Sequence, residues 1–196
     1  MFATGWIERV SRIHPATPFV FWLPVLAALS VRAVRSGVGA PLFAALALGG
    51  VLLWTLTEYT LHRFVFHYVG PRPWQRRLHF ILHGVHHDFP DDADRLVMPL
   101  GISIPLGAAF YVLLRAALGP VLVDPAFVGL TLGYLAYDGT HYAVHHLPMR
   151  SRWARRIKRH HMLHHHAEAG ARWGVSSPLW DWVFGTLGAR SRDRRA

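Results

Sequence analysis

The sequence predicts an all-α integral membrane protein, with four transmembrane helices in two hairpins and a helical cap on the cytoplasmic side. Three observations predict this fold: the apolar residues are concentrated in four long blocks, glycine and proline separate the blocks pairwise, and the basic residues collect on one side of the resulting topology. The length of 196 residues suits one domain, which we place at residues 1–188, followed by a polar tail at 189–196.

The apolar blocks cover Phe19–Val34, Pro41–Thr57, Leu96–Leu118 and Val121–Tyr137. Each is close to the ~20 residues that cross a bilayer core as a helix. Buried helices of a soluble protein are the alternative, but too few polar residues remain to cover such blocks. Turns between the helices are predicted at Ser36–Ala40 and at Gly119-Pro120 with Asp124-Pro125, because these residues interrupt helices.

Charge sets the predicted orientation. The formal net charge is +10, which can indicate nucleic-acid binding, but the positions of the basic residues favour a membrane topology without nucleic acid. Two lie in a short amphipathic lead at 1–18, five lie between Arg63 and Arg95, and eleven follow from Arg150 onward, so that 18 of 21 share one side. The positive-inside rule places that side, with both termini, in the cytoplasm.

Cytoplasmic helices are predicted from the second apolar block through Glu58–His67 until Pro71 and Pro73, then at Trp74–His87, and as a basic helix at 150–166. Fourteen of the fifteen histidines fall in four segments at or beside these helices: Glu58–His67, His79–His87, Asp138–His146 and His160–His166. No cysteine is present, which excludes disulfides and thiolate metal sites.

The spacing of the histidines predicts that they act together. His83, His86 and His87 stand at i, i+3 and i+4, which places them on one helix face, and His161, His164 and His165 repeat the pattern. His141 and His145 stand at i, i+4. His62 and His67 stand at i, i+5, so that pair needs a helix end or a π-bulge.

Ten imidazoles converging on one volume are too many for one metal ion and suit two ions a few ångströms apart. Two acidic residues are expected to orient these ligands, Glu58 four residues before His62 and Asp138 three before His141. Local capping or ion pairing is the alternative role for both carboxylates. The flanking His79, His146, His160 and His166 are expected to support the ligands or to lie exposed.

The histidine segments are EYTLHRFVFH (58–67), LHGVHHDFPDDADRLVMP (82–99), YDGTHYAVHH (137–146) and HMLHHH followed by WGVSSPLWDWVFGT (161–186). In this order they resemble the fatty acid hydroxylase superfamily, and most of all its fatty acid 2-hydroxylase branch, which acts on sphingolipid acyl chains. The resemblance implies a di-metal centre with the ligands His62, His67, His83, His86, His87, His141, His145, His161, His164 and His165.

The resemblance also implies the activity: two iron ions activate O₂ to hydroxylate a lipid or fatty acyl chain, with carbon 2 favoured because it lies near the membrane interface. No side chain is needed as a nucleophile or general base. Zinc, which lacks redox chemistry, is expected as a substitute in purified samples. The haem domain fused to many members is absent from this sequence, so we expect a separate ferredoxin-like or cytochrome-type electron carrier.

Other functions stay open from the sequence. A sterol, carotenoid or alkyl-lipid hydroxylase, or a desaturase, would use the same histidines with a different pocket. A histidine-rich membrane protein that binds or transports metal is the non-enzyme alternative, although the apolar blocks lack the polar residues at the bilayer midplane that transport requires.

Overall fold

The structure is a computed structural model that describes Gly5 and residues 12–167 and 170–188. Every regular element among these residues is helical, which confirms the predicted all-α class. The predicted lead at 1–18 lies largely, and the polar tail at 189–196 entirely, outside the described residues.

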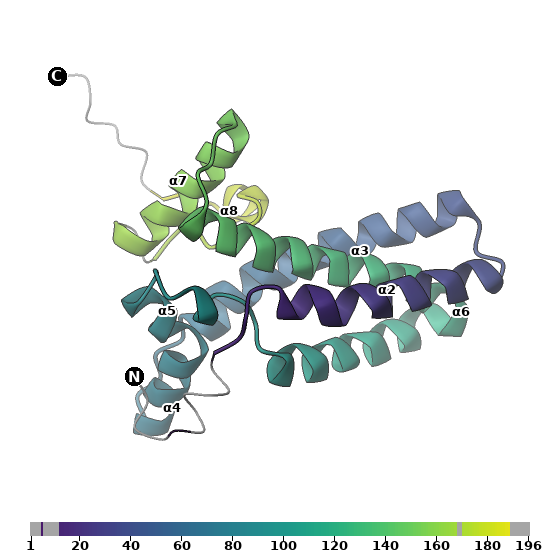
Figure 1. The fold of residues 1–196 in the computed structure, drawn as a ribbon, viewed down its shortest axis with the longest axis horizontal. Coiled ribbons are helices and arrows are strands. Elements are labelled where there is room, and N and C mark those ends of the chain that lie inside the picture. The colour runs from purple at the N-terminus through teal and green to yellow at the C-terminus, as the bar shows by residue number, and fades with distance from the viewer. Residues whose placement is uncertain (1–4, 6–11, 168–169, 189–196) are drawn as a thin grey trace. The chain divides into compact units, whose positions relative to one another are not determined.

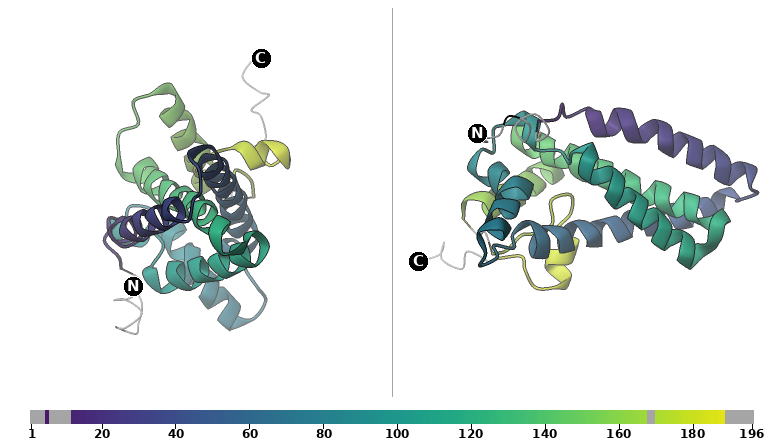
Figure 2. Two further views of the ribbon diagram at one scale, coloured as in Figure 1. Left: turned by 90° about the vertical axis from the view of Figure 1, so that its right-hand side faces the viewer. Right: turned by 90° about the horizontal axis from the view of Figure 1, so that it is seen from below.

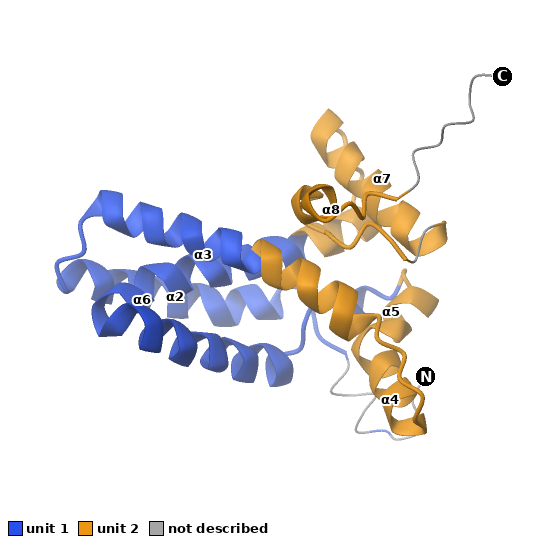
Figure 3. Cartoon of the chain, turned by 180° about the vertical axis from the view of Figure 1, so that it is seen from behind, with its two compact units in different colours: residues 1–54, 92–139 blue, residues 55–91, 140–196 orange. Residues whose placement is uncertain are grey.

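The chain divides into two compact units, each made of two separate stretches of sequence (Figure 3). Unit 1 comprises residues 1–54 and 92–139, and unit 2 comprises residues 55–91 and 140–196. Helices α3 (Ala40–Leu61) and α6 (Leu100–His146) each have residues in both units, so the boundary between the units does not coincide with a break in the chain. The prediction of a single domain at 1–188 stays a prediction.

Unit 1 contains the apolar helices. They are α2 (Thr17–Arg35), the first part of α3 (Ala40–Leu61) and most of α6 (Leu100–His146), which lie side by side in Figures 1 and 2. Within the described part of the chain, three helical stretches are long and apolar enough to cross a membrane: Thr17–Arg35, Ala40–Phe66 and Ala93–His146.

The longest helix, α6, is broken at Gly119, whose φ of 80° and ψ of 176° are non-helical. The break separates the third and fourth apolar blocks at the predicted turn. Asp124 and Pro125, however, lie within the helix after the break and do not form part of a turn. Asp124 is held there by Arg32, whose Nε and Nη2 donate to it at 2.6 and 2.5 Å.

Glycine allows α3 and α6 to approach closely. A Cβ atom at Gly50 would lie 2.0 Å from the carbonyl oxygen of Ala126, and one at Gly129 would lie 1.9 Å from that of Ala47. Small residues at such contacts are a common feature of membrane helix pairs. The two backbones therefore touch along this interface.

Unit 2 contains the shorter helices. They are the π-helical turn η1 (His62–Phe66), α4 (Pro73–His79), the π-helical turn η2 (Phe80–Gly84), α5 (Val85–Asp88), α7 (Arg152–His166) and α8 (Leu179–Val183). The predicted helix at Trp74–His87 is helical throughout but contains the π turn η2. The predicted basic helix at 150–166 corresponds to α7.

Candidate metal centre

A π turn places the first two histidines on one side of their helix. In η1 the backbone N–H of His67 donates to the carbonyl oxygen of His62 at 3.3 Å, five residues back. The two ring centroids consequently lie 4.9 Å apart. Of the two arrangements that the i, i+5 spacing allowed, the chain adopts the π-bulge, which is frequent at functional sites.

Unit 2 gathers ten histidines into two groups of five. Within each group one ring nitrogen from every member lies within 4.8 Å of the others. The first group is His62, His67, His83, His87 and His164, and the second is His86, His141, His145, His161 and His165. These are the ten residues singled out from the sequence.

The two groups have matching compositions. Each takes one pair from a long helix, His62 with His67 or His141 with His145. Each also takes the i and i+4 members of one HxxHH motif and the i+3 member of the other motif. The sequence left open how the ligands divide between two ions, and in the structure each HxxHH motif contributes to both groups.

The distances within the groups fit metal coordination. The Nε2 atom of His83 lies 3.1 Å from those of His62 and His87, and the Nε2 atoms of His86 and His141 lie 2.9 Å apart. Two nitrogens that each bind one ion at about 2.1 Å are about 3.0 Å apart when they meet it at a right angle. The lone pairs of neutral imidazoles repel one another at this distance unless a cation or a proton lies between them.

The protonation state also suits metal binding. Burial, followed by the charge of neighbouring imidazoles, lowers the pKa of His67 and His87 to about 3. The same causes lower the pKa of His83, His86 and His161 well below the usual value for histidine. These side chains are neutral at physiological pH, which is the form that binds a metal ion.

The outer nitrogens distinguish the two groups. In the first, Nδ1 of His62 donates to the carbonyl oxygen of Trp173 at 2.5 Å, and Nδ1 of His164 donates to that of Ala171 at 2.7 Å. In the second, the buried Nδ1 atoms of His86, His161 and His165 have no hydrogen-bond partner in the described part of the chain.

Glu58 is buried, and its hydrogen bonds go to the loop that contains Val175 and Ser176 and not to an imidazole. Its carboxylate accepts hydrogen bonds from the N–H groups of Val175 and Ser176 at 2.6 and 2.8 Å, and from the Ser176 hydroxyl at 2.5 Å. Asp138 is also buried, and it accepts from the N–H of Met98 at 3.3 Å.

A third carboxylate, Asp181, holds a loop beside the first group, and neither was predicted from the sequence. Asp181 is fully buried and accepts from the N–H groups of Trp173 and Gly174, both at 2.8 Å, and from the Thr186 hydroxyl at 2.7 Å. His160 lies 3.0 Å away from the carboxylate. Burial raises the pKa of Asp181, but these hydrogen bonds outweigh it and lower the pKa overall. The motif WGVSSPLWDWVFGT contained the signal, because it has one acidic residue amid apolar ones.

The flanking histidines take other positions. Nδ1 of His79 donates to the carbonyl oxygen of Phe66 at 2.6 Å, next to the first group, and His160 is bound to Asp181. His166 is exposed and belongs to neither group.

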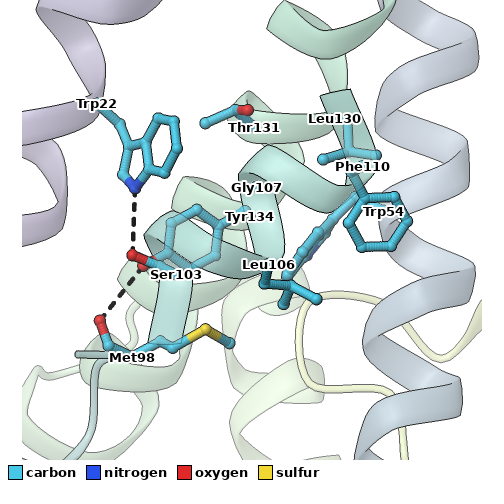
Figure 4. Close-up of a pocket in the computed structure, with 10 residues that line it drawn as sticks. All are labelled: Trp22, Trp54, Met98, Ser103, Leu106, Gly107, Phe110, Leu130, Thr131 and Tyr134. Atoms are coloured by element: carbon cyan, nitrogen blue, oxygen red, sulfur yellow. Dashed lines mark hydrogen bonds between the residues drawn. The ribbon is translucent and has the colours of Figure 1, made fainter. Parts of the chain in front are cut away.

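Unit 1 contains a small, mainly apolar cavity of about 20 Å³ among α2, α3 and α6 (Figure 4). Two hydrogen bonds cross its wall, from Nε1 of Trp22 to the Ser103 hydroxyl at 3.4 Å and from the Tyr134 hydroxyl to the carbonyl oxygen of Met98 at 3.5 Å. The remaining lining residues are Trp54, Leu106, Gly107, Phe110, Leu130 and Thr131. Such a lining suits hydrocarbon.

Comparison with known proteins is consistent with this geometry. The fatty acid hydroxylase family model matches residues 47–186. A dihydroceramide fatty acyl 2-hydroxylase of Arabidopsis thaliana is 36% identical over 176 residues, covering 90% of this chain and 74% of that protein. The fatty acid 2-hydroxylase of Homo sapiens is 34% identical over 209 residues, covering 95% of this chain and 56% of that protein.

A solved structure agrees as well. Full-length scs7p, in which only the hydroxylase domain is visible, superposes with a TM-score of 0.88 at 35% identity, covering 96% of this chain and 72% of that chain. Together with the three apolar helices, these matches identify an integral membrane protein. They confirm the resemblance found in the histidine segments, and the chain belongs to the fatty acid hydroxylase family.

Proposed function

We propose that this chain is a di-iron oxygenase that hydroxylates a lipid acyl chain at carbon 2. The observation that carries the proposal is the pair of histidine groups, whose nitrogens are spaced as ligands of two ions. Relatives of 34–41% identity are named fatty acid 2-hydroxylases and dihydroceramide fatty acyl 2-hydroxylases, which supports the substrate class and the carbon position.

All ten histidines are proposed as the ligands, five to each ion. Iron bound there would supply the redox chemistry that activates O₂ for insertion into a C–H bond, which zinc cannot do. The electrons would come from a separate carrier protein.

The protein itself holds the imidazole ligands in place and excludes bulk water from them. The buried imidazoles stay neutral, and the carbonyl oxygens of Ala171 and Trp173 fix the outer nitrogens of two of them. Burial of His62, His161 and His164 keeps bulk water from the ligands. No side chain is required as an acid or base, so the residues act by positioning one methylene beside the ions.

The substrate would enter from the bilayer. We propose that the cavity lined by Trp22, Trp54 and Tyr134 receives part of the acyl chain, since its lining is apolar and its helices are the membrane helices. We further propose four spans, with the break at Gly119 as the outer turn between the third and fourth. The positive-inside distribution of arginine and lysine supports a cytoplasmic location for both termini and the metal site.

The test is product analysis combined with metal analysis. Membranes from cells that express the chain should contain 2-hydroxyacyl lipids, and the purified protein should hold about two ions, as ten imidazoles in two groups imply. His86→Ala and His164→Ala should abolish the product and lower the metal content while membrane insertion persists. His166→Ala, which alters an exposed histidine outside both groups, is the matched control and should retain activity.

An alkene product in place of the hydroxylated lipid would assign the chain to desaturation. Normal hydroxylation by both group variants would refute the assignment of the ligands.

A further inference from the structure

The two histidine groups are equivalent in ligand type but differ in what lies behind the ligands. Each offers five imidazoles, drawn from the same kinds of motif. Any difference in affinity between them must therefore come from the outer nitrogens and from how firmly the rings are held.

A short loop, residues 171–176, lies behind the first group. Its carbonyl oxygens at Ala171 and Trp173 accept the Nδ1 protons of His164 and His62 at 2.7 and 2.5 Å. This bond fixes the tautomer, because a neutral ring that donates from Nδ1 must present a lone pair at Nε2. Both rings consequently point a lone pair at the centre of the first group before any ion arrives.

Two buried carboxylates hold this loop from opposite ends. Asp181, on α8, takes the N–H groups of Trp173 and Gly174, and Glu58, on α3, takes those of Val175 and Ser176. Four consecutive backbone donors are thus satisfied by two side chains that are 0% and 3% exposed. The pKa of Asp181 is lowered, so it is ionised, and hydrogen bonds to an ionised carboxylate are about twice as strong as neutral ones. Together with the bonds to Glu58, they fix the loop firmly.

Three of the five rings in the second group lack this support among the described residues. The outer nitrogens of His86, His161 and His165 are buried without a hydrogen-bond partner there, so no described protein group selects their tautomer. An ion entering this group must order the rings and choose the tautomers as it binds, which costs affinity.

Building on the proposed function, we propose that the loop 171–176, clamped by Asp181 and Glu58, makes the first group the tighter metal site, and that it fills before the second. Asp181 and Glu58 are positioning residues: they touch neither ion, and they act through the carbonyl oxygens that orient His62 and His164. Loss of such outer contacts typically weakens metal affinity by about 10–100-fold, which sets the expected separation of the two sites.

The experiment titrates the full-length protein in lipid nanodiscs, stripped by chelation, with Co²⁺ alone. Visible absorption and competition with a chromophoric chelator give the affinities. We expect two classes of one ion each, separated by roughly tenfold or more. His67→Ala should remove the tight class and His145→Ala the weak one, since neither residue belongs to a shared HxxHH motif.

The decisive variant is Asp181→Asn, which should weaken the tight class by about 10–100-fold and leave the weak class unchanged. Ser176→Ala removes only the 2.5 Å side-chain bond to Glu58, so a smaller loss in the same class is expected even where Asp181→Asn folds poorly. Asp91→Asn, an exposed carboxylate in unit 2, is the matched control and should leave the tight class intact.

Equal affinity of both ions in the unaltered protein would overturn the inference, as would equal weakening of both classes, or no weakening, by Asp181→Asn and Ser176→Ala. Failure of the unaltered protein to bind any ion would instead overturn the proposed function. The two failures are therefore distinguishable.

Discussion

Replacing Gly50 by alanine should force α3 away from α6 in the membrane unit. The added Cβ would lie 2.0 Å from the carbonyl oxygen of Ala126 and 2.6 Å from the backbone nitrogen of Leu130. Both neighbours are main-chain atoms of a helix and cannot rotate aside. Because real Cβ contacts essentially never fall below 3.0 Å, the helices must separate locally by about 1 Å or more.

The loss of stability can be estimated from the packing that this separation disturbs. Trp54 lies one turn after Gly50 and meets the Tyr134 ring edge-on at 5.2 Å, and both side chains are buried. Overpacking of a well-filled interior typically costs about 1–3 kcal/mol. For a chain of this size each 1 kcal/mol lowers the melting temperature by about 2–4 °C, so the variant should melt roughly 2–12 °C lower.

The assay is thermal unfolding of the purified protein in one detergent, with Gly49→Ala as the matched control. Gly49 is the adjacent residue of the same helix, and a Cβ there would meet nothing within 4 Å. That substitution should keep or raise the melting temperature, because alanine favours a helix over glycine by up to about 1 kcal/mol. Equal melting temperatures for the two variants would refute the close contact between α3 and α6.

Three further outcomes are expected. The metal-free protein should lose stability as the pH falls from about 6.5 toward 3. In that range His67 and His87 become protonated in the unfolded chain but stay neutral in the folded chain, where their pKa is about 3. A melting temperature that is constant over this range would contradict the burial of these rings. Arg32→Leu should cost about 1–3 kcal/mol, because buried Asp124 would keep only the Tyr111 hydroxyl as a donor, and should lower the melting temperature more than Asp124→Asn, so the reverse order would argue against the pair. Thr131→Leu, which narrows the cavity, should reduce the share of the longest hydroxylated acyl chains at unchanged metal content, whereas an unchanged chain-length profile would place the acyl chain elsewhere.

Local patterns in the sequence predicted most of the helices. The apolar blocks correspond to α2, α3 and the two arms of α6, and the i, i+5 spacing of His62 and His67 required a departure from a regular helix, which η1 provides. The turn at Asp124-Pro125 was wrong because a long-range contact with Arg32 holds Asp124 inside the helix. Contacts between residues so far apart in the sequence cannot be detected in the local pattern of apolar residues.

The loop 171–176 could not be predicted for a related reason. Its order comes from backbone N–H groups that bind Glu58 and Asp181, and every residue except proline carries such a group. Side-chain identity therefore says nothing about which N–H groups are bound. The sequence could mark Glu58 as a candidate by its place before His62, but not the loop through which it acts.

The spacing of the ten histidines in the sequence does not determine which of them belong to which group. A regular helix turns about 100° per residue, so the i and i+4 positions of an HxxHH motif are about 40° apart, while i+3 and i+4 are about 100° apart. His83 and His87 can thus meet one ion while His86 faces another, and the second motif does the same with the groups exchanged. Because each motif then contributes to both groups, ordering either motif around one ion also places a ligand for the other. On the proposed assignment, the two sites would be coupled through these helices, and the clamped loop behind the first group would determine which one is ordered first.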